Sequence, residues 1–143
     1  MRRRFKTARC ILYRDGQYLL AVHNRFRHLS RQRWGLIGGQ VEWGESPRVA
    51  AARELEEELE VTVGELIEVG AYSYKQAMHM VYAAPAMGEV GRFDTNELID
   101  VGWFSEPEVA GLRARSALHA DYELDAIQRL RRQLDAPGRT ATG

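Results

Sequence analysis

Three glutamates, Glu54, Glu57 and Glu58, stand at the spacing i, i+3 and i+4 in the sequence. In an α-helix this spacing brings the three carboxylates to within an arc of roughly 100°. Like charges placed this way repel one another and destabilise the helix. A divalent cation reverses that effect, because hard cations such as Mg²⁺ bind clustered oxygen ligands. The spacing is therefore typical of one of two features, a solvated acidic helix face or a site for divalent metal ions.

The helix that would carry these glutamates is predicted to begin after Ser46 and to continue to Glu60. Ser46 is a favourable N-cap, and Pro47 suits the first helical position. The segment contains strong helix formers and no internal glycine or proline. Four apolar side chains recur at three- and four-residue spacing and predict the buried stripe of the helix: Val49, Ala52, Leu55 and Leu59. On this prediction the three glutamates face away from the core.

The elements around this helix are predicted to be mostly strands. Residues 10–13 and 18–22 form a hairpin across Asp15-Gly16, which is a strong turn signal. Further strands are expected at 34–37, 66–74, 78–84 and 99–104, a short helix from Ser105, and a closing helix at 120–134. The fold class is therefore α/β, with one domain over residues 1–134 and a disordered tail over residues 135–143.

The composition excludes several classes of protein. The chain has 143 residues with 20 basic and 20 acidic side chains, so it lacks the basic excess of a general nucleic-acid binder. Its one cysteine, Cys10, excludes an internal disulfide framework and is predicted to be a buried strand residue without a redox role. No apolar run approaches the ~18–20 residues that span a bilayer. We therefore expect a cytoplasmic protein with no membrane partner.

The basic residues are concentrated at the start of the chain, where residues 1–33 carry ten of them against one acidic residue. A predicted loop holds five basic side chains: Arg25, Arg27, His28, Arg31 and Arg33. Arginine makes forked contacts with phosphate, so this loop is a candidate phosphate clamp; the alternative is a solvated loop. Trp43 lies between Glu42 and Gly44 in a predicted turn, where it is a candidate to stack on a base or another ring.

A longer pattern surrounds the three glutamates. It consists of Gly39, five residues, Glu45, seven residues, Arg53-Glu54-Leu55, one residue, Glu57-Glu58, one residue, and Glu60-Val61. This pattern resembles the signature of the Nudix hydrolases at eight of its nine fixed positions, and Glu60 replaces the ninth, a glycine. The flanking segments 34–39 and 101–108 resemble the family as well, so the resemblance covers roughly residues 8–134.

The resemblance implies a fold, an activity and a cofactor. The fold is an α/β/α sandwich with a mixed β-sheet between helices. The activity is Mg²⁺-dependent hydrolysis, with Mn²⁺ as a substitute, of the diphosphate linkage in a nucleoside diphosphate joined to another group. Nucleoside triphosphates are the preferred substrates, and a homodimer is compatible with the family. A non-catalytic nucleotide-binding or regulatory relative is the alternative.

The resemblance also assigns roles to individual residues. The metal ligands are Glu54, Glu57, Glu58, the backbone carbonyl of Gly38, and Glu97, with Asp94 as the alternative to Glu97. Glu54 is the preferred general base and Glu97 the second candidate. Arg53 holds glutamate side chains in place and pairs with Glu45, which is structural like Gly39.

Several other residues are predicted to affect stability or packing. A glycine at the position of Glu60 would supply a left-handed helix end. Glu60 is therefore expected to lower stability modestly, by about 1 kcal/mol, or else the helix ends differently near Gly64. His79 and His119 are predicted to be structural. Three tyrosines are predicted to pack on the sheet, with one of them able to line a pocket: Tyr72, Tyr74 and Tyr82.

Overall fold

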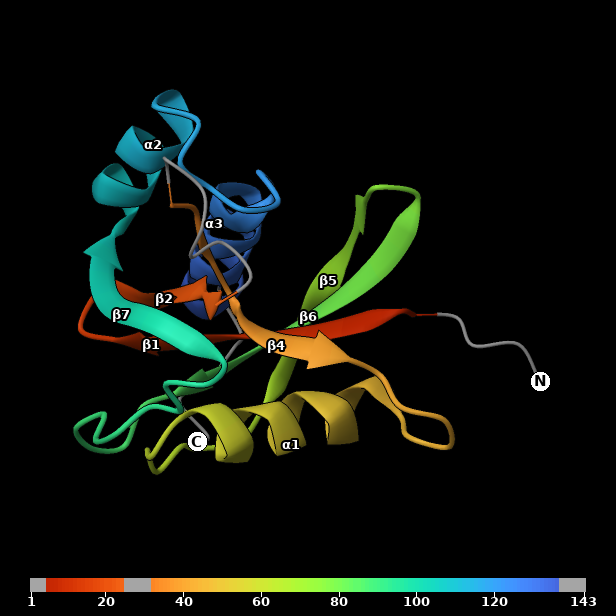
Figure 1. Cartoon of the computed structure of the whole chain (residues 1–143). Helices are drawn as coiled ribbons and strands as arrows, with labels where there is room; N and C mark the ends of the chain where they lie inside the picture. Colours follow the sequence, from red (N-terminus) through yellow and green to blue (C-terminus); the bar gives the residue numbers. More distant parts are fainter. Residues whose placement is uncertain (1–4, 25–31, 137–143) are drawn as a thin grey trace.

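The computed structural model describes residues 5–24 and 32–136. Seven strands lie in it (Figure 1): β1 (Thr7–Arg14), β2 (Gln17–His23), β3 (Trp34–Gly35), β4 (Ile37–Gln40), β5 (Ile67–Tyr74), β6 (Ala77–Pro85) and β7 (Leu98–Ser105). The helices are α1 (Pro47–Glu58), α2 (Glu106–Ala114) and α3 (Glu123–Asp135). Each predicted strand and helix is present, although several boundaries differ by a few residues.

The strands form one mixed sheet in which β1 is central. β1 pairs parallel with β6 and antiparallel with β2 and β4. β2 pairs in turn with β3 and β7, and β5 pairs antiparallel with β6. The β1–β2 turn has Asp15 at φ 52° and Gly16 at φ 75°, the left-handed conformation that the Asp-Gly signal predicts.

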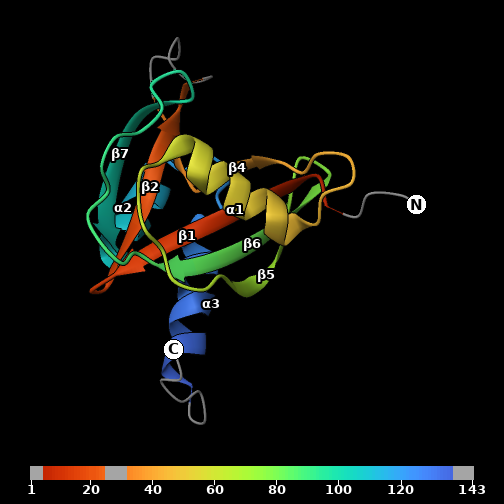
Figure 2. The ribbon, with the colours of Figure 1, turned by 90° about the horizontal axis from the view of Figure 1, so that it is seen from below.

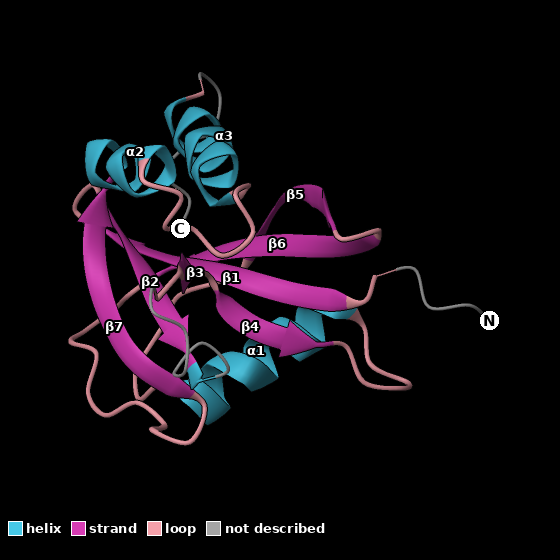
Figure 3. Ribbon diagram, turned by 45° about the horizontal axis from the view of Figure 1, so that its top comes forward, coloured by secondary structure: helices cyan, strands magenta, loops and turns pink. Residues whose placement is uncertain are grey.

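Helices cover both faces of the sheet, so the predicted α/β/α sandwich is confirmed. α1 lies on one face, and α2 with α3 on the other (Figures 1 and 3). The larger apolar core lies beneath α2 and α3 and includes Ile11, Leu20 and Ile127. On the other face Leu55 and Leu59 of the α1 region pack with Ile37 and other strand residues.

The buried face predicted for α1 is half right: Leu55 and Leu59 are buried, whereas Val49 and Ala52 are exposed. Val49 is 54% exposed, and the buried residues of the helix are Ala50, Ala51, Leu55 and Glu58. The two small alanines let the helix lie close against the sheet, where it contacts β1, β4 and β6 (Figure 2). The rotation of the helix places Glu58 against the sheet rather than away from the core.

The end of α1 explains how Glu60 replaces a glycine. The cap residue Leu59 has φ −132° and ψ 148°, and Glu60 is not among the described residues with positive φ. The chain leaves the helix in an extended conformation, with the Glu60 N–H donating to Arg92 O and the Gly91 N–H donating to Glu60 O. The second of the two expectations for Glu60 therefore holds, because the helix end needs no left-handed residue.

Glu60→Gly is consequently expected to destabilise the protein by about 0.5–1 kcal/mol, because glycine has more conformational freedom to lose on folding. Urea unfolding of this variant beside Glu65→Gly, an exposed position outside regular structure, measures the effect against a general Glu-to-Gly cost. A gain in stability for Glu60→Gly alone would show that residue 60 adopts the left-handed conformation.

Two further features differ from the predictions or limit them. α3 begins at Glu123 instead of Ala120, and Leu134 is 37% exposed at its end. Part of the predicted tail, residues 137–143, lies outside the described residues. Across the described chain, no helix combines the length and the apolar character needed to cross a membrane.

Candidate active site

Three glutamates of α1, Glu54, Glu57 and Glu58, line a cavity of about 650 Å³. A volume of this size is within the range of small-molecule sites. One side of the cavity is acidic and is formed by Glu42, Glu54, Glu57, Glu58 and Glu97. The backbone of Gly38, Gly39 and Gln40 in and beside β4 lies along the same cavity. The structure thus brings together all the residues that the resemblance assigns to metal binding.

Two glycines let the backbone and the carboxylates approach each other. A Cβ on Gly39 would lie 2.6 Å from Glu54 Oε1, so a larger residue there would displace the Glu54 carboxylate from this position. Gly38 has φ +149°, and a Cβ there would lie 2.2 Å from the carbonyl oxygen of Ala8 on β1. The carbonyl of Gly38 accepts a hydrogen bond of 3.1 Å from Nη1 of Arg9, a buried side chain of β1. This bond leaves the carbonyl oxygen a second lone pair for another partner.

Glu58 is a buried carboxylate that lacks a full set of partners. It is 2% exposed, and its Oε2 has no hydrogen-bond partner. Burial, and then the charge of Glu54, raises the pKa of Glu58 to about 8. Burial also raises the pKa of Glu54. The two pKa values are raised because burial and neighbouring negative charges both disfavour ionised carboxylates. A bound divalent cation would offset this effect by stabilising the carboxylate anions.

The C-terminal end of α1 also favours a bound cation. Glu57 and Glu58 occupy its last turn, which contains no basic residue. The C-terminus of a helix carries a partial negative charge, so carboxylates are unfavourable there and cations are favourable. The residues present therefore fit a divalent cation, judged from the orphaned Glu58 oxygen, the oxygen-only donor set and the helix end.

Glu97, rather than Asp94, reaches the cavity. Asp94 uses its Oδ1 to accept from the Asn96 N–H at 2.9 Å, and its carbonyl accepts from the Glu97 N–H at 3.0 Å. The carbonyl of Glu97 accepts from the Asn24 N–H at 2.8 Å. Asp94 thus shapes the turn that places Glu97, and only Glu97 of the two lines the acidic cavity.

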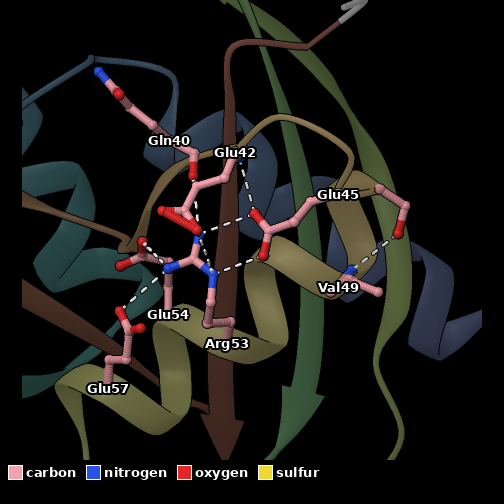
Figure 4. A network of polar contacts seen from close by, with 8 residues as sticks. Gln40, Glu42, Glu45, Val49, Arg53, Glu54 and Glu57 are labelled. Atoms are coloured by element: carbon pink, nitrogen blue, oxygen red, sulfur yellow. Dashed lines mark hydrogen bonds and ion pairs between the residues drawn. The ribbon is translucent and has the colours of Figure 1, made fainter.

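Arg53 connects four parts of the site (Figure 4). Its Nε and Nη2 donate to the two carboxylate oxygens of Glu45 at 2.7 and 3.0 Å, which is the predicted pair. Its Nη1 donates to Glu54 at 3.0 Å and to Glu57 at 3.2 Å, and Nη2 also donates to the carbonyl of Gln40 at 3.2 Å.

The carboxylates of the cavity are not yet positioned as a metal site. Within residues 5–24 and 32–136, no three acidic, histidine or cysteine side chains stand close enough to hold a metal as they are. Arg53 contacts one oxygen of Glu54 and one oxygen of Glu57, so its hydrogen bonds leave the second oxygen of each carboxylate for a cation.

The Arg53–Glu45 pair leads to a prediction about pH. Hydrogen bonds from Arg53 and from the Glu42 backbone lower the pKa of Glu45 from 4.5 to about 2. A carboxylate whose pKa is lower in the folded state stabilises the fold above its unfolded pKa, and this contribution is lost as the pH falls toward the folded value. Glu45→Gln is therefore expected to lower Tm at pH 7. The difference from wild type should shrink between about pH 4.5 and pH 2, and a difference independent of pH would contradict the pairing.

Two of the residues expected to bind substrate lie away from this cavity. Arg33 donates through Nη1 to the carbonyl of Ser116 at 3.0 Å and does not line the cavity. Trp43 is 83% exposed and does not line it either. The turn holding Trp43 is closed by bonds between Glu42 and Glu45. Arg33 is instead held by the α2–α3 connection, a long-range contact that the sequence pattern did not reveal. Arg25, Arg27, His28 and Arg31 lie outside the described residues.

The structure adds cavity residues that the sequence did not indicate as site residues. His23, His79 and His119 line the side of the cavity away from α1, together with Tyr74, Lys6 and Lys75. They come from β2, β5, β6 and the connections beside them, at separations that follow no sequence spacing. The prediction of purely structural roles for His79 and His119 is therefore incomplete. Tyr74 is the tyrosine that lines the cavity.

Comparison with known proteins agrees with this geometry. The sequence model of the NUDIX domain matches residues 3–125. The chain is 32% identical over 101 residues to the NAD-capped RNA hydrolase NudC of Vibrio atlanticus (strain LGP32). The match covers 67% of this chain and 36% of NudC, so the chain spans only about a third of that relative.

Solved structures show the same fold. The chain is 30% identical to the E. coli ORF135 protein, with a TM-score of 0.63 and coverage of 91% of this chain and 92% of that one. It is 27% identical to a MutT NUDIX hydrolase from Burkholderia pseudomallei, with a TM-score of 0.61 and coverage of 71% and 83%. The sandwich fold, the cavity beside α1 and the family match together identify this protein as a hydrolase. The chain belongs to the Nudix hydrolase family.

Proposed function

We propose that the protein hydrolyses the diphosphate linkage of a nucleoside diphosphate joined to another group, with nucleoside triphosphates as the preferred substrates and Mg²⁺ or Mn²⁺ as the cofactor. The observation that carries this proposal is the convergence of Glu54, Glu57, Glu58 and Glu97 on one cavity with the Gly38 backbone. The pattern Gly39 to Val61, in which these helix glutamates lie, supports it.

The roles of the residues follow from charge. Glu54, Glu57, Glu58, Glu97 and the carbonyl of Gly38 would hold the cation, which when bound neutralises phosphate oxygens and lowers the pKa of water. Glu54 accepts the proton of the attacking water, and Glu97 is the second candidate for this role. Arg53 holds the side chains of Glu54 and Glu57 in place and pairs with Glu45. Arg25 and Arg27 are proposed to contact phosphate.

The test is a panel of ATP, GTP, CTP, UTP, ADP-ribose and NAD with Mg²⁺, each assayed with and without a chelator. NAD is included because the similar protein NudC is named for hydrolysis of NAD-capped RNA. We expect at least one member to yield a nucleoside monophosphate together with pyrophosphate or a phosphorylated second product. Turnover that persists in the chelator, or no turnover of the panel by folded protein, would overturn the proposal.

A further inference from the structure

Three of the four histidines of the chain meet at one cavity. His23 ends β2, His79 lies on β6, and His119 lies between α2 and α3. Together with Tyr74 of β5 they line the side of the cavity that lies away from α1. We name these four residues, His23, Tyr74, His79 and His119, the histidine wall.

The rings of the histidine wall contact one another in series. The ring centroids are 6.1 Å apart for His23 and His119, 5.5 Å for Tyr74 and His119, and 5.8 Å for Tyr74 and His79. Beyond the wall, His79 Nδ1 lies 2.7 Å from the hydroxyl of the buried Tyr122. Each ring of the wall therefore contacts a ring from a different element.

His119 is held by its backbone as well as its ring. Its N–H donates to the carbonyl of Trp34 at 2.8 Å, and the Trp34 N–H donates to Ala117 O at 2.8 Å. A Cβ on Gly35 would lie 3.0 Å from the Cβ of His119, so the glycine makes room for this side chain. Because the backbone bonds do not involve the imidazole, the ring can be removed without breaking the bonds that hold the segment.

The chemistry of the wall differs from that of the acidic side. Imidazole and phenol groups both donate and accept hydrogen bonds, and their rings are planar. A phosphate offers acceptors only, whereas the edge of a nucleobase offers donors and acceptors in one plane. Of the two lysines that also line the cavity, Lys75 has its ammonium 5.4 Å from the centroid of the Tyr74 ring. The wall therefore matches a planar heterocycle better than another phosphate.

We propose that the histidine wall binds the nucleobase of the substrate and that His119 and Tyr74 determine which base is preferred. This inference rests on the proposed function, because it assumes that the acidic side of the same cavity receives the diphosphate. A cavity of about 650 Å³ has room for both parts of one nucleotide. The preference thus comes from residues outside the segment 39–61.

The experiment compares ATP, GTP, CTP and UTP with methyl triphosphate, which has the same phosphates and no base. For wild type we expect kcat/KM to favour one nucleotide over methyl triphosphate. In His119→Ala and in Tyr74→Leu this ratio is expected to fall about 10-fold, the effect of losing one or two base contacts. The matched control is Tyr72→Leu on the same strand, which packs against Tyr122 at a centroid distance of 5.1 Å and does not line the cavity. Its ratio should stay within about 2-fold of wild type.

A binding measurement separates this inference from the proposed function. AMP, GMP, CMP and UMP are titrated calorimetrically into metal-free protein, where no hydrolysis is involved. A base preference in wild type that His119→Ala and Tyr74→Leu lose would support the wall even if no triphosphate were hydrolysed. Nucleotide hydrolysis with the same ratio in wild type and both variants would overturn the wall and leave the proposed function standing. If the melting curve shows that either His119→Ala or Tyr74→Leu does not fold, the remaining variant tests the role of the wall.

Discussion

Glu58→Gln is expected to lower kcat/KM for the best nucleotide substrate by about 10³-fold, since each tenfold corresponds to 1.36 kcal/mol and cation-mediated charge stabilisation is worth several kcal/mol. Glutamine preserves the size of the side chain and replaces the carboxyl group, whose Oε2 lacks a hydrogen-bond partner, with a neutral amide. Steady-state kinetics over a series of Mg²⁺ concentrations measures the change. Part of the loss should be recovered at high Mg²⁺ if the carboxylate binds the cation.

The same substitution should not destabilise the metal-free protein. Glu58 is buried, and its carboxyl has a raised pKa because burial and Glu54 oppose its charge. A neutral glutamine removes that opposition, so Tm without metal should be equal to or above that of wild type. Loss of activity with unchanged or higher Tm would separate a functional role from a structural one.

Glu56→Gln is the matched control. Glu56 lies on the same helix, is exposed and does not line the acidic cavity. Its removal should change kcat/KM by no more than about 2-fold. Equal losses in Glu56→Gln and Glu58→Gln would contradict the assignment of Glu58 and would favour the solvated acidic face.

Gly38→Ala is expected to destabilise the fold by about 3 kcal/mol or more, through overpacking and backbone strain together. The new Cβ would meet the Ala8 carbonyl oxygen at 2.2 Å and the Arg9 Cα at 2.8 Å, both backbone atoms of the central strand β1. These atoms cannot move without disturbing the pairing of β1 with its neighbours. In a chain of this length such a loss lowers Tm by roughly 6–12 °C.

Alanine substitutions at two other glycines distinguish the cost of backbone strain from the cost of steric overlap. Gly44 has φ +83° with no atom within 4 Å of an added Cβ, so Gly44→Ala should cost about 1–2 kcal/mol from backbone strain alone. Gly88 has open space and no positive φ, so Gly88→Ala should lie within about 0.5 kcal/mol of wild type. Denaturant unfolding of the three variants gives the ranking. A Gly38→Ala protein as stable as Gly88→Ala would contradict the packing of β4 on β1.

Much of the architecture was predictable because it depends on local chemistry. The Asp15-Gly16 turn, the Ser46-Pro47 helix start and the strand segments are set by backbone preferences of neighbouring residues, and all are present. The buried side of α1 was predicted correctly at Leu55 and Leu59 but incorrectly at Val49 and Ala52, because apolar periodicity does not show how closely a helix approaches the sheet. Close packing against the sheet instead selected the small residues Ala50 and Ala51.

The sequence by itself determined the acidic chemistry of the site. Glu54, Glu57, Glu58 and Arg53 are neighbours on one helix, so their proximity follows from helical geometry. Tertiary structure alone decided that Glu58 is buried, that Glu97 rather than Asp94 reaches the cavity, and that Arg33 does not. It also brought His23, Tyr74, His79 and His119 together from three parts of the chain, which are β2, the β5–β6 hairpin and the α2–α3 connection. The physical reason is that these contacts join strands and connections far apart in sequence, whose pairing and packing no local spacing specifies.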